Sequence, residues 1–387
     1  MSEPEPEPCP MDEALMEIDE DLFYPQARRD PLRVADFNAF VMQAIGLTIE
    51  DYLRGARVVR DYSESLDLKI VSLQPFANFD GMMSASKKEL IKEAFTEVWL
   101  KVLEILGVMM VGVPAAYNCE EDFSNILYET SEDVNWISQE LLKTPGIMVG
   151  YEPLCFSRFN STWQAALNVV NGSNYKSILD GNLPITGLII DTFNLCGSTI
   201  ANPITDTGFE VNGHEILDKS LDELKRSVAV KNGIICLVQV ADAKLVKRGR
   251  SNPYDINKKE VKRVWSRNYR LFPCETKRGA YLPVLKALRE LTDPEGIAYQ
   301  GYISLEVFVG SSEERTIDPV YHSMAASYMP DQAGSWGLPT AAALECGHRA
   351  RTSWMRLCGE LGWQSDWSPK TDAEYVGYSD SVYSGDE

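Results

Sequence analysis

Four polar side chains follow or interrupt apolar runs, at points where a hydrophobic core would not tolerate them. The runs IMVGY, GLII and YISL lead to Glu152, Asp191 and Glu306, and Gln239 lies inside ICLVQV. A buried carboxylate without a partner is costly, and carboxylates that face one cavity repel one another. A divalent cation relieves this repulsion, and an all-oxygen set of ligands favours Mg²⁺ or Mn²⁺ over zinc. The four residues therefore predict a metal site with open positions for substrate and water.

Each of these residues has an ordinary explanation when it is taken alone. A glutamate at a strand end is more often a surface or salt-bridged residue, and a glutamine in a strand is usually a satisfied core amide. Asp191, which precedes Thr-Phe-Asn, is also explained as a turn or helix cap. Metal binding is favoured only because four such residues fall on four separate apolar runs.

A second group of functional side chains is basic, in a chain that is otherwise acidic. The segment 258–284 is rich in Lys and Arg and contains Arg267 and Arg270. Arginine presents a planar fork that binds a carboxylate or phosphate through two hydrogen bonds. By charge alone, however, a solvated basic loop that pairs with surface acids is the simpler interpretation. Gln74, at the end of another apolar run, is a candidate either to line a pocket or to turn the chain.

The elements that must position these residues alternate between strands and helices. Seven segments have the short apolar runs of buried strands, namely 16–24, 68–76, 108–115, 147–154, 187–193, 233–241 and 301–309. This alternation predicts an α/β fold of the (β/α)8 TIM-barrel type, in which catalytic residues lie at the carboxyl ends of the strands. A doubly wound open sheet is the alternative. Since a barrel has eight strands and seven are visible, one strand is missing or irregular.

Amphipathic patterns and capping signals predict the helices between these strands. The helix of 87–107 carries an apolar stripe through Phe95 and Val102, and Gly107 is placed to end it. The spacing of Ser161 and Gln164 is that of a capping box. A last helix is expected over 341–361.

Composition and charge exclude several classes of function. The chain has 387 residues with 37 Lys and Arg against 57 Asp and Glu, so its net charge is −20, which disfavours nucleic acid and anionic membranes as partners. It has no apolar run of membrane-spanning length and no secretory signal, and its scattered cysteines are typical of a cytoplasmic protein. We expect a disordered acidic N-terminus over 1–13, a barrel over 14–363 and a disordered acidic tail over 364–387.

The sequence resembles the fungal-type 3-dehydroshikimate dehydratases, which belong to the xylose-isomerase-like (sugar phosphate isomerase/epimerase) TIM-barrel superfamily. The resemblance covers about residues 14 to 361 and is carried by six stretches in the same order: LKIVSLQPF, VGYEPLCF, LIIDTFNLCG, VQVADAKL, WSRNYRLFPCE with the following RGAYLPVL, and YISLEVF. It implies a divalent metal, Mg²⁺, Mn²⁺ or a similar ion, on the four residues named first, which are Glu152, Asp191, Gln239 and Glu306. It also implies that Arg267 and Arg270 hold a substrate carboxylate. By the same resemblance the seven visible strands are strands two to eight, so the first strand is the one that is missing or irregular.

The reaction implied by the resemblance is the removal of water from 3-dehydroshikimate to give protocatechuate through a metal-stabilised enolate. Some relatives place a histidine three residues after the metal-binding aspartate, where it acts as base. This chain has Asn194 there, which leaves a metal-bound water, Glu17 or Asp19 as the base. The candidate catalytic residues are Arg267, Glu17 and Asn194. The last of these occupies the position of that histidine.

Two other functions stay open from the residues alone. One is an isomerase or epimerase for a sugar-like ketone on the same scaffold, and the other is a degenerate barrel that binds without turnover. In the main hypothesis the partner is a small cyclic hydroxy-keto acid, and the pathway is either quinate catabolism or a secondary-metabolite route. The segment 315–338 is a candidate lid or homodimer contact.

Overall fold

The computed structural model describes residues 48–118, 123–228, 233–245, 258–307 and 341–363. The chain separates into two compact units, which divide between Leu338 and Pro339. The predicted strand at 16–24, the segment 315–338 and the predicted tails at 1–13 and 364–387 lie outside the described residues. The bounds of the predicted barrel domain stay a prediction.

The first unit is built on six parallel strands. They are β1 (Ser72–Leu73), β2 (Met110–Pro114), β3 (Met148–Glu152), β4 (Thr186–Asp191), β5 (Ile235–Val240) and β8 (Ile303–Leu305). Each strand pairs in parallel with the next one in this order, without a reversal of strand order. Such sequential pairing is typical of a TIM barrel, whereas a doubly wound sheet changes direction at a switch point. The predicted fold class is confirmed, and six of the seven predicted strands are among the described residues.

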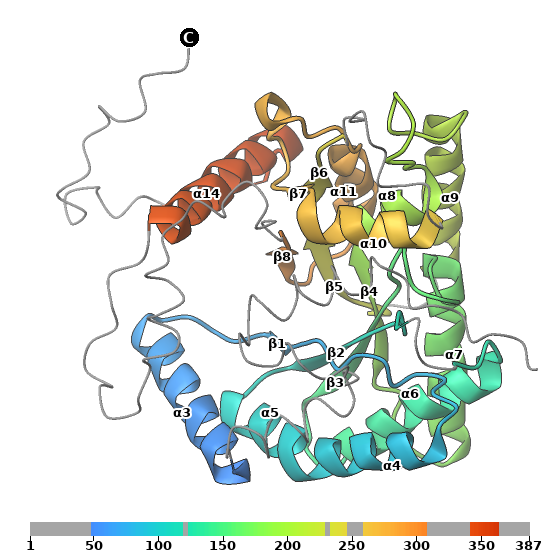
Figure 1. The fold of residues 1–387 in the computed structure, drawn as a ribbon, viewed down its shortest axis with the longest axis vertical. Helices are drawn as coiled ribbons and strands as arrows, with labels where there is room; N and C mark the ends of the chain where they lie inside the picture. The colour runs from blue at the N-terminus through green and yellow to red at the C-terminus, as the bar shows by residue number, and fades with distance from the viewer. Residues whose placement is uncertain (1–47, 119–122, 229–232, 246–257, 308–340, 364–387) are drawn as a thin grey trace, which may run out of the picture. The chain divides into compact units, whose positions relative to one another are not determined.

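Helices alternate with these strands along the chain and cover them on the outside, as Figure 1 shows for α4 to α7 beside β2, β3 and β4. The helices of this unit are α3 (Ile49–Ser65), α4 (Ala85–Ala94), α5 (Leu100–Leu106), α6 (Leu127–Leu141), α7 (Trp163–Leu179), α8 (Thr192–Thr199), α9 (Gly213–Val228), α10 (Lys258–Asn268) and α11 (Val284–Thr292). Two short turns of other types are η1, a π-helix (Phe95–Trp99), and η2, a 3₁₀-helix (Thr276–Arg278).

The inner face of the sheet is lined by alternate residues, two of which are glycines. Gly112 of β2 pairs with Gly150 of β3, two residues below the end of the strands. A Cβ at Gly150 would lie 2.5 Å from Met110 Sδ and 2.8 Å from Ile189 Cδ1, which belong to the core below the strand ends. A Cβ at Gly112 would lie 2.5 Å from Oε1 of Gln74. The two glycines thus make room for inner-face side chains beneath the carboxyl ends of β2 and β3.

Two local features differ from the sequence patterns. The predicted helix of 87–107 is interrupted by the π-helix η1, and this extra residue in the turn shifts the buried face from Val102 to Leu103. The helix ends at Gly107, in the left-handed conformation, as predicted. The N-cap of α7 is Thr162, whose hydroxyl accepts the N–H of Ala165, so the predicted Ser161 cap was one residue early.

The basic segment 258–284 is not a plain loop. It contains α10, and then β7 (Arg270–Leu271) pairs antiparallel with β6 (Asp242–Ala243), which directly follows the end of β5. Arg270 is buried, with 4% of its surface exposed. The interpretation of this segment as a solvated basic loop is therefore wrong for Arg270.

The second unit contains the described helix α14 (Ala341–Leu361), with the bounds predicted from its sequence pattern. Within it the rings of Trp354 and Trp363 contact each other at 5.8 Å between centroids. No helix in the described part of the chain is both long and apolar enough to cross a bilayer. The cytoplasmic location and the homodimer contact stay predictions.

Candidate metal centre

Three of the four predicted ligands meet at the carboxyl ends of the strands. Glu152 is the last residue of β3, Asp191 is the last residue of β4, and Glu306 directly follows β8. Each offers a carboxylate oxygen, and the three oxygens lie within 4.8 Å of one another. Glu152 and Asp191 are 6% and 1% exposed. Three separate strands therefore bring three acidic side chains into one buried space, as the sequence predicted.

Gln239, the fourth predicted ligand, lies on β5 between the strands that carry Asp191 and Glu306. Its Cα is opposite that of Asp191 in the parallel register, so both side chains are on the same face of the sheet. Gln239 is fully buried, and neither its amide oxygen nor its amide nitrogen has a hydrogen-bond partner among the described residues. Since buried amides are nearly always hydrogen-bonded, this side chain fits a site in which its amide faces a bound group.

A guanidinium group lies between two of the carboxylates. Nη1 of Arg270 is 2.8 Å from Oδ2 of Asp191 and 3.1 Å from Oε2 of Glu306. The hydroxyl of Ser266, one turn earlier in α10, accepts weaker bonds from the Arg270 Nε and Nη2 atoms at 3.4 and 3.3 Å. The ring of Phe193 lies 4.4 Å from the guanidinium carbon, which gives a cation–π contact. Arg270 is thus a buried positive charge fixed against the acidic group.

The side-chain amide of Asn194 joins the carboxylates of Glu152 and Asp191. Nδ2 of Asn194 donates to Oε1 of Glu152 at 3.0 Å and to Oδ2 of Asp191 at 2.8 Å. Its Oδ1 accepts the backbone N–H of Cys155 at 3.1 Å. Asp191 also caps helix α8, because its Oδ1 accepts the N–H of Phe193 at 2.8 Å. The helix-cap explanation of Asp191 and its place in the acidic site are therefore both correct.

The three carboxylates of the centre carry more negative charge than Arg270 compensates. Burial, followed by repulsion from Glu306 and Asp191, raises the pKa of Glu152 well above its ordinary value, against the opposing effect of Arg270 and Asn194. Burial also raises the pKa of Asp191 and of Glu306, although Arg270 counteracts it in both. The pKa of Arg270 is raised because the attraction of the three carboxylates outweighs the effect of burial.

The other predicted site residues lie at different depths around this centre. Arg267, in the last turn of α10, is half-buried and close enough to Glu306 to lower the pKa of that carboxyl. Gln74 follows β1, and its side chain lies over Gly112 on the inner face. Glu17 and Asp19 lie outside the described residues. The catalytic and substrate-binding roles of all these residues stay predictions.

Two supporting residues were not anticipated from the sequence. Ser266 and Phe193 contact the guanidinium of Arg270, but neither carries a charge. The only signal in the sequence was their spacing, since Ser266 is four residues before Arg270 and Phe193 is two residues after Asp191.

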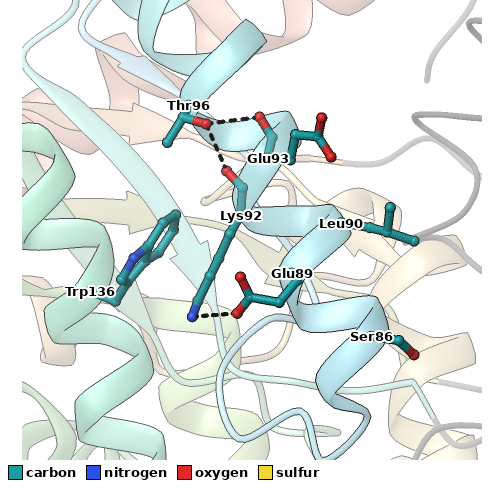
Figure 2. A pocket seen from close by; sticks show the side chains of 7 residues that line it. All are labelled: Ser86, Glu89, Leu90, Lys92, Glu93, Thr96 and Trp136. Atoms are coloured by element: carbon teal, nitrogen blue, oxygen red, sulfur yellow. Dashed lines mark hydrogen bonds and ion pairs between the residues drawn. The ribbon is translucent and has the colours of Figure 1, made fainter.

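A separate surface hollow lies along helix α4, and Figure 2 shows its lining. Lys92 pairs there with Glu89 at 2.9 Å and lies over the ring of Trp136, while Leu90 and Ser86 point away from this contact. Its lining contains none of the predicted site residues. The hollow has an ordinary surface ion pair and no convergent acids, so the strand ends are the better candidate for a functional site.

The donor set at the strand ends fits a divalent cation. It offers three carboxylates and one unpartnered amide, all of which present oxygen, in a buried space on separate strands. Oxygen ligands of this kind suit hard cations such as Mg²⁺ and Mn²⁺. Fold and site together define a class: TIM-barrel proteins with an acidic candidate metal centre at the carboxyl ends of the strands.

Comparison with known proteins narrows this class. The chain is 30% identical over 268 residues to a 3-dehydroshikimate dehydratase of Neurospora crassa, which covers 68% of this chain and 70% of that protein. The chain belongs to the 3-dehydroshikimate dehydratase family, as the sequence resemblance implied. A 3-dehydroshikimate dehydratase of Pseudomonas aeruginosa is 26% identical over 65% of this chain and 31% of that longer protein.

Among solved structures, a xylose isomerase-like TIM barrel/4-hydroxyphenylpyruvate dioxygenase fusion protein is similar, with a TM-score of 0.46 and 22% identity. The match covers 65% of this chain and 32% of the fusion protein. No family model matches the chain.

Proposed function

We propose that this protein is a metal-dependent lyase that converts 3-dehydroshikimate to protocatechuate, with Mg²⁺ or Mn²⁺ held by Glu152, Asp191, Gln239 and Glu306. The observation that carries the proposal is the convergence of three carboxylates, two of them buried and one partly buried, within 4.8 Å at the ends of parallel strands. The buried, unpartnered amide of Gln239 supports it. The family to which the chain belongs supports the choice of substrate.

The overall change is the loss of one water, so it needs no oxidant or reductant. A proton leaves the carbon beside the ketone, the hydroxyl one carbon further leaves as water, and a further proton shift completes the aromatic ring. A divalent cation, when bound, supplies the Lewis acid that polarises the ketone and makes the neighbouring C–H bond more acidic. The protein's own residues then have to hold the ring and move protons.

The basic and amide side chains supply the hold on the substrate. Arg267 is half-buried and Arg270 is buried, so Arg267 is the more accessible of the two to an entering carboxylate. Arginine suits this task because its planar fork fixes a carboxylate in orientation as well as in position. Gln74, on the inner face, has an amide oxygen without a hydrogen-bond partner among the described residues, which is suited to accept a substrate hydroxyl.

The base is an acid or water rather than Asn194. Both functions of the Asn194 amide are used, since its nitrogen donates to two carboxylates and its oxygen accepts a backbone N–H. An amide nitrogen has no basic lone pair for a proton. We keep a metal-bound water, Glu17 and Asp19 as the candidates for the base.

The test is a turnover assay with 3-dehydroshikimate and Mn²⁺ or Mg²⁺, followed through the near-ultraviolet absorbance of the aromatic product. Glu306→Gln is expected to lower kcat/KM at least about a hundredfold, because even groups that only orient a metal ligand are worth about 10–100-fold. Glu89→Gln, which alters the hollow on α4, is the matched control and should leave activity unchanged.

Two results would contradict the proposal. One is the absence of aromatic product with every divalent metal tried. The other is an activity that survives Glu306→Gln but falls in Glu89→Gln, which would move the active site to α4. Formation of an isomer of a sugar-like ketone in place of protocatechuate would support the epimerase hypothesis instead.

A further inference from the structure

Asn194 contacts two carboxylates of the acidic centre, and these come from two different strands. It lies in the first turn of α8 and is 1% exposed. Its amide nitrogen bridges a carboxylate from β3 and a carboxylate from β4, and its amide oxygen holds the backbone of Cys155, three residues after β3 ends. One side chain therefore ties together two strand ends and the loop that follows one of them.

The two bridged carboxylates have a physical reason to separate. Glu152 and Asp191 are both buried and of like charge, and each raises its free energy by approaching the other. The two N–H bonds of one planar amide oppose this repulsion and fix the direction of one oxygen on each carboxylate. Arg270 performs the same task for Asp191 and Glu306, so Oδ2 of Asp191 is contacted by both Asn194 and Arg270.

We propose that Asn194 is a positioning residue that sets the spacing and orientation of Glu152 and Asp191, and thereby the affinity of the centre for a divalent cation. It acts through its two N–H bonds and does not take a proton from the substrate. This inference rests on the metal centre of the proposed function. It assigns to this chain's asparagine an organising task for the two carboxylates beside it.

The competing explanation is that Asn194 is only a packing residue of α8. A matched asparagine exists for comparison, since Nδ2 of Asn202 also donates to a carboxylate, Oε1 of Glu210, at 3.0 Å. Asn202 is 9% exposed and its partner is not one of the three converging acids. If burial and a bond to a carboxylate were all that mattered, substitutions at Asn194 and Asn202 would have the same consequences.

The experiment is a calorimetric titration of the full chain with Mn²⁺, on the wild type and on Asn194→Leu, Asn194→Ser and Asn202→Leu. Leucine has a similar volume and no N–H, and we expect the Kd for Mn²⁺ to rise about 10–100-fold. Serine keeps one donor, which can serve one carboxylate at most, so its Kd should be intermediate. Asn202→Leu should bind Mn²⁺ as the wild type does. The electron paramagnetic resonance spectrum of bound Mn²⁺ should change in the Asn194 variants alone.

A Kd in Asn194→Leu within twofold of the wild type would overturn the inference. If that variant does not fold, an unchanged Kd in Asn194→Ser overturns it equally. Turnover of 3-dehydroshikimate by the wild type is measured in parallel. Binding of Mn²⁺ without aromatic product would refute the proposed function while the effect of Asn194 still supports this inference, and a wild type that binds no Mn²⁺ would overturn both.

Discussion

At the scale of single residues, Arg270 has the largest expected effect on stability. Its side chain is 2% exposed and bridges Asp191 and Glu306, whose side chains are 0% and 19% exposed. Removal of one partner from a buried ion pair leaves an uncompensated charge and costs about 3–5 kcal/mol. We therefore expect Arg270→Met to lower the free energy of unfolding by about this amount in the presence of a chelator, as measured by urea denaturation.

Added Mn²⁺ should restore part of that stability, because a bound cation replaces the missing positive charge and stabilises the folded state that binds it. Arg60→Met is the control, since Arg60 pairs with Asp61 on the exposed surface of α3, and it should leave the unfolding free energy unchanged. Equal effects of Mn²⁺ on both variants would argue against a shared role of Arg270 and the cation.

At the scale of the elements, the two glycines on the inner face leave the space that neighbouring inner-face side chains occupy. A Cβ at Gly150 would lie 2.5 Å from Met110 Sδ and 2.8 Å from Ile189 Cδ1. Gly150→Ala should therefore lower the free energy of unfolding by about 1–3 kcal/mol through overpacking. Gly55→Ala in α3 is the matched control, because a Cβ added at Gly55 would have no atom within 4 Å. Alanine is the better helix former, so this change should raise stability by up to about 1 kcal/mol in the same denaturation experiment. A Gly150→Ala variant as stable as the wild type would show that the core around Met110 is loosely packed.

The sequence predicted elements well where burial alone determines them. The buried strands β2 to β5 followed from apolar runs, and the acids at the ends of β3, β4 and β8 could be named in advance because they follow such runs. The π-helix at Phe95–Trp99 and the cap at Thr162 could not, because each depends on a shift of one residue that the pattern also accommodates. The inward position of Arg270 depends on the pairing of β6 with β7, two-residue strands too short to leave a periodic signal. The contacts of Asn194 are set by how β3 and β4 are packed, which residue types do not reveal.

At the scale of the whole molecule, the free energy of unfolding should depend on pH through the ionisation of Asp80. This aspartate is 3% exposed and its Oδ2 accepts the hydroxyl of Tyr151 at 2.6 Å. Burial outweighs that hydrogen bond and raises the pKa of Asp80 from 3.8 to about 7. The folded state therefore holds a proton that the unfolded chain has released, so this group makes stability fall as pH rises from about 4 to about 7, by at most about 1.4 kcal/mol per pH unit.

Asp80→Asn keeps an acceptor for Tyr151 and removes the ionisation. The loss of unfolding free energy between pH 5 and pH 7.5 should thus be smaller in this variant than in the wild type, as measured by denaturation at both values. The control is Asp67→Asn, an exposed aspartate with a φ of 56°, a conformation that asparagine also adopts readily. A slope in Asp80→Asn equal to that of the wild type would mean that Asp80 is ionised in the folded protein throughout this range.

The guanidinium between Asp191 and Glu306 also determines the charge balance of the centre. Three ionised carboxylates contribute −3 and Arg270 contributes +1, and −3 + 1 leaves −2. An ion of charge +2 brings this sum to zero, whereas a monovalent ion leaves a deficit and a trivalent ion an excess. With Arg270 in place, the centre thus matches the charge of a divalent cation, whereas without it the same acids would carry a charge of −3.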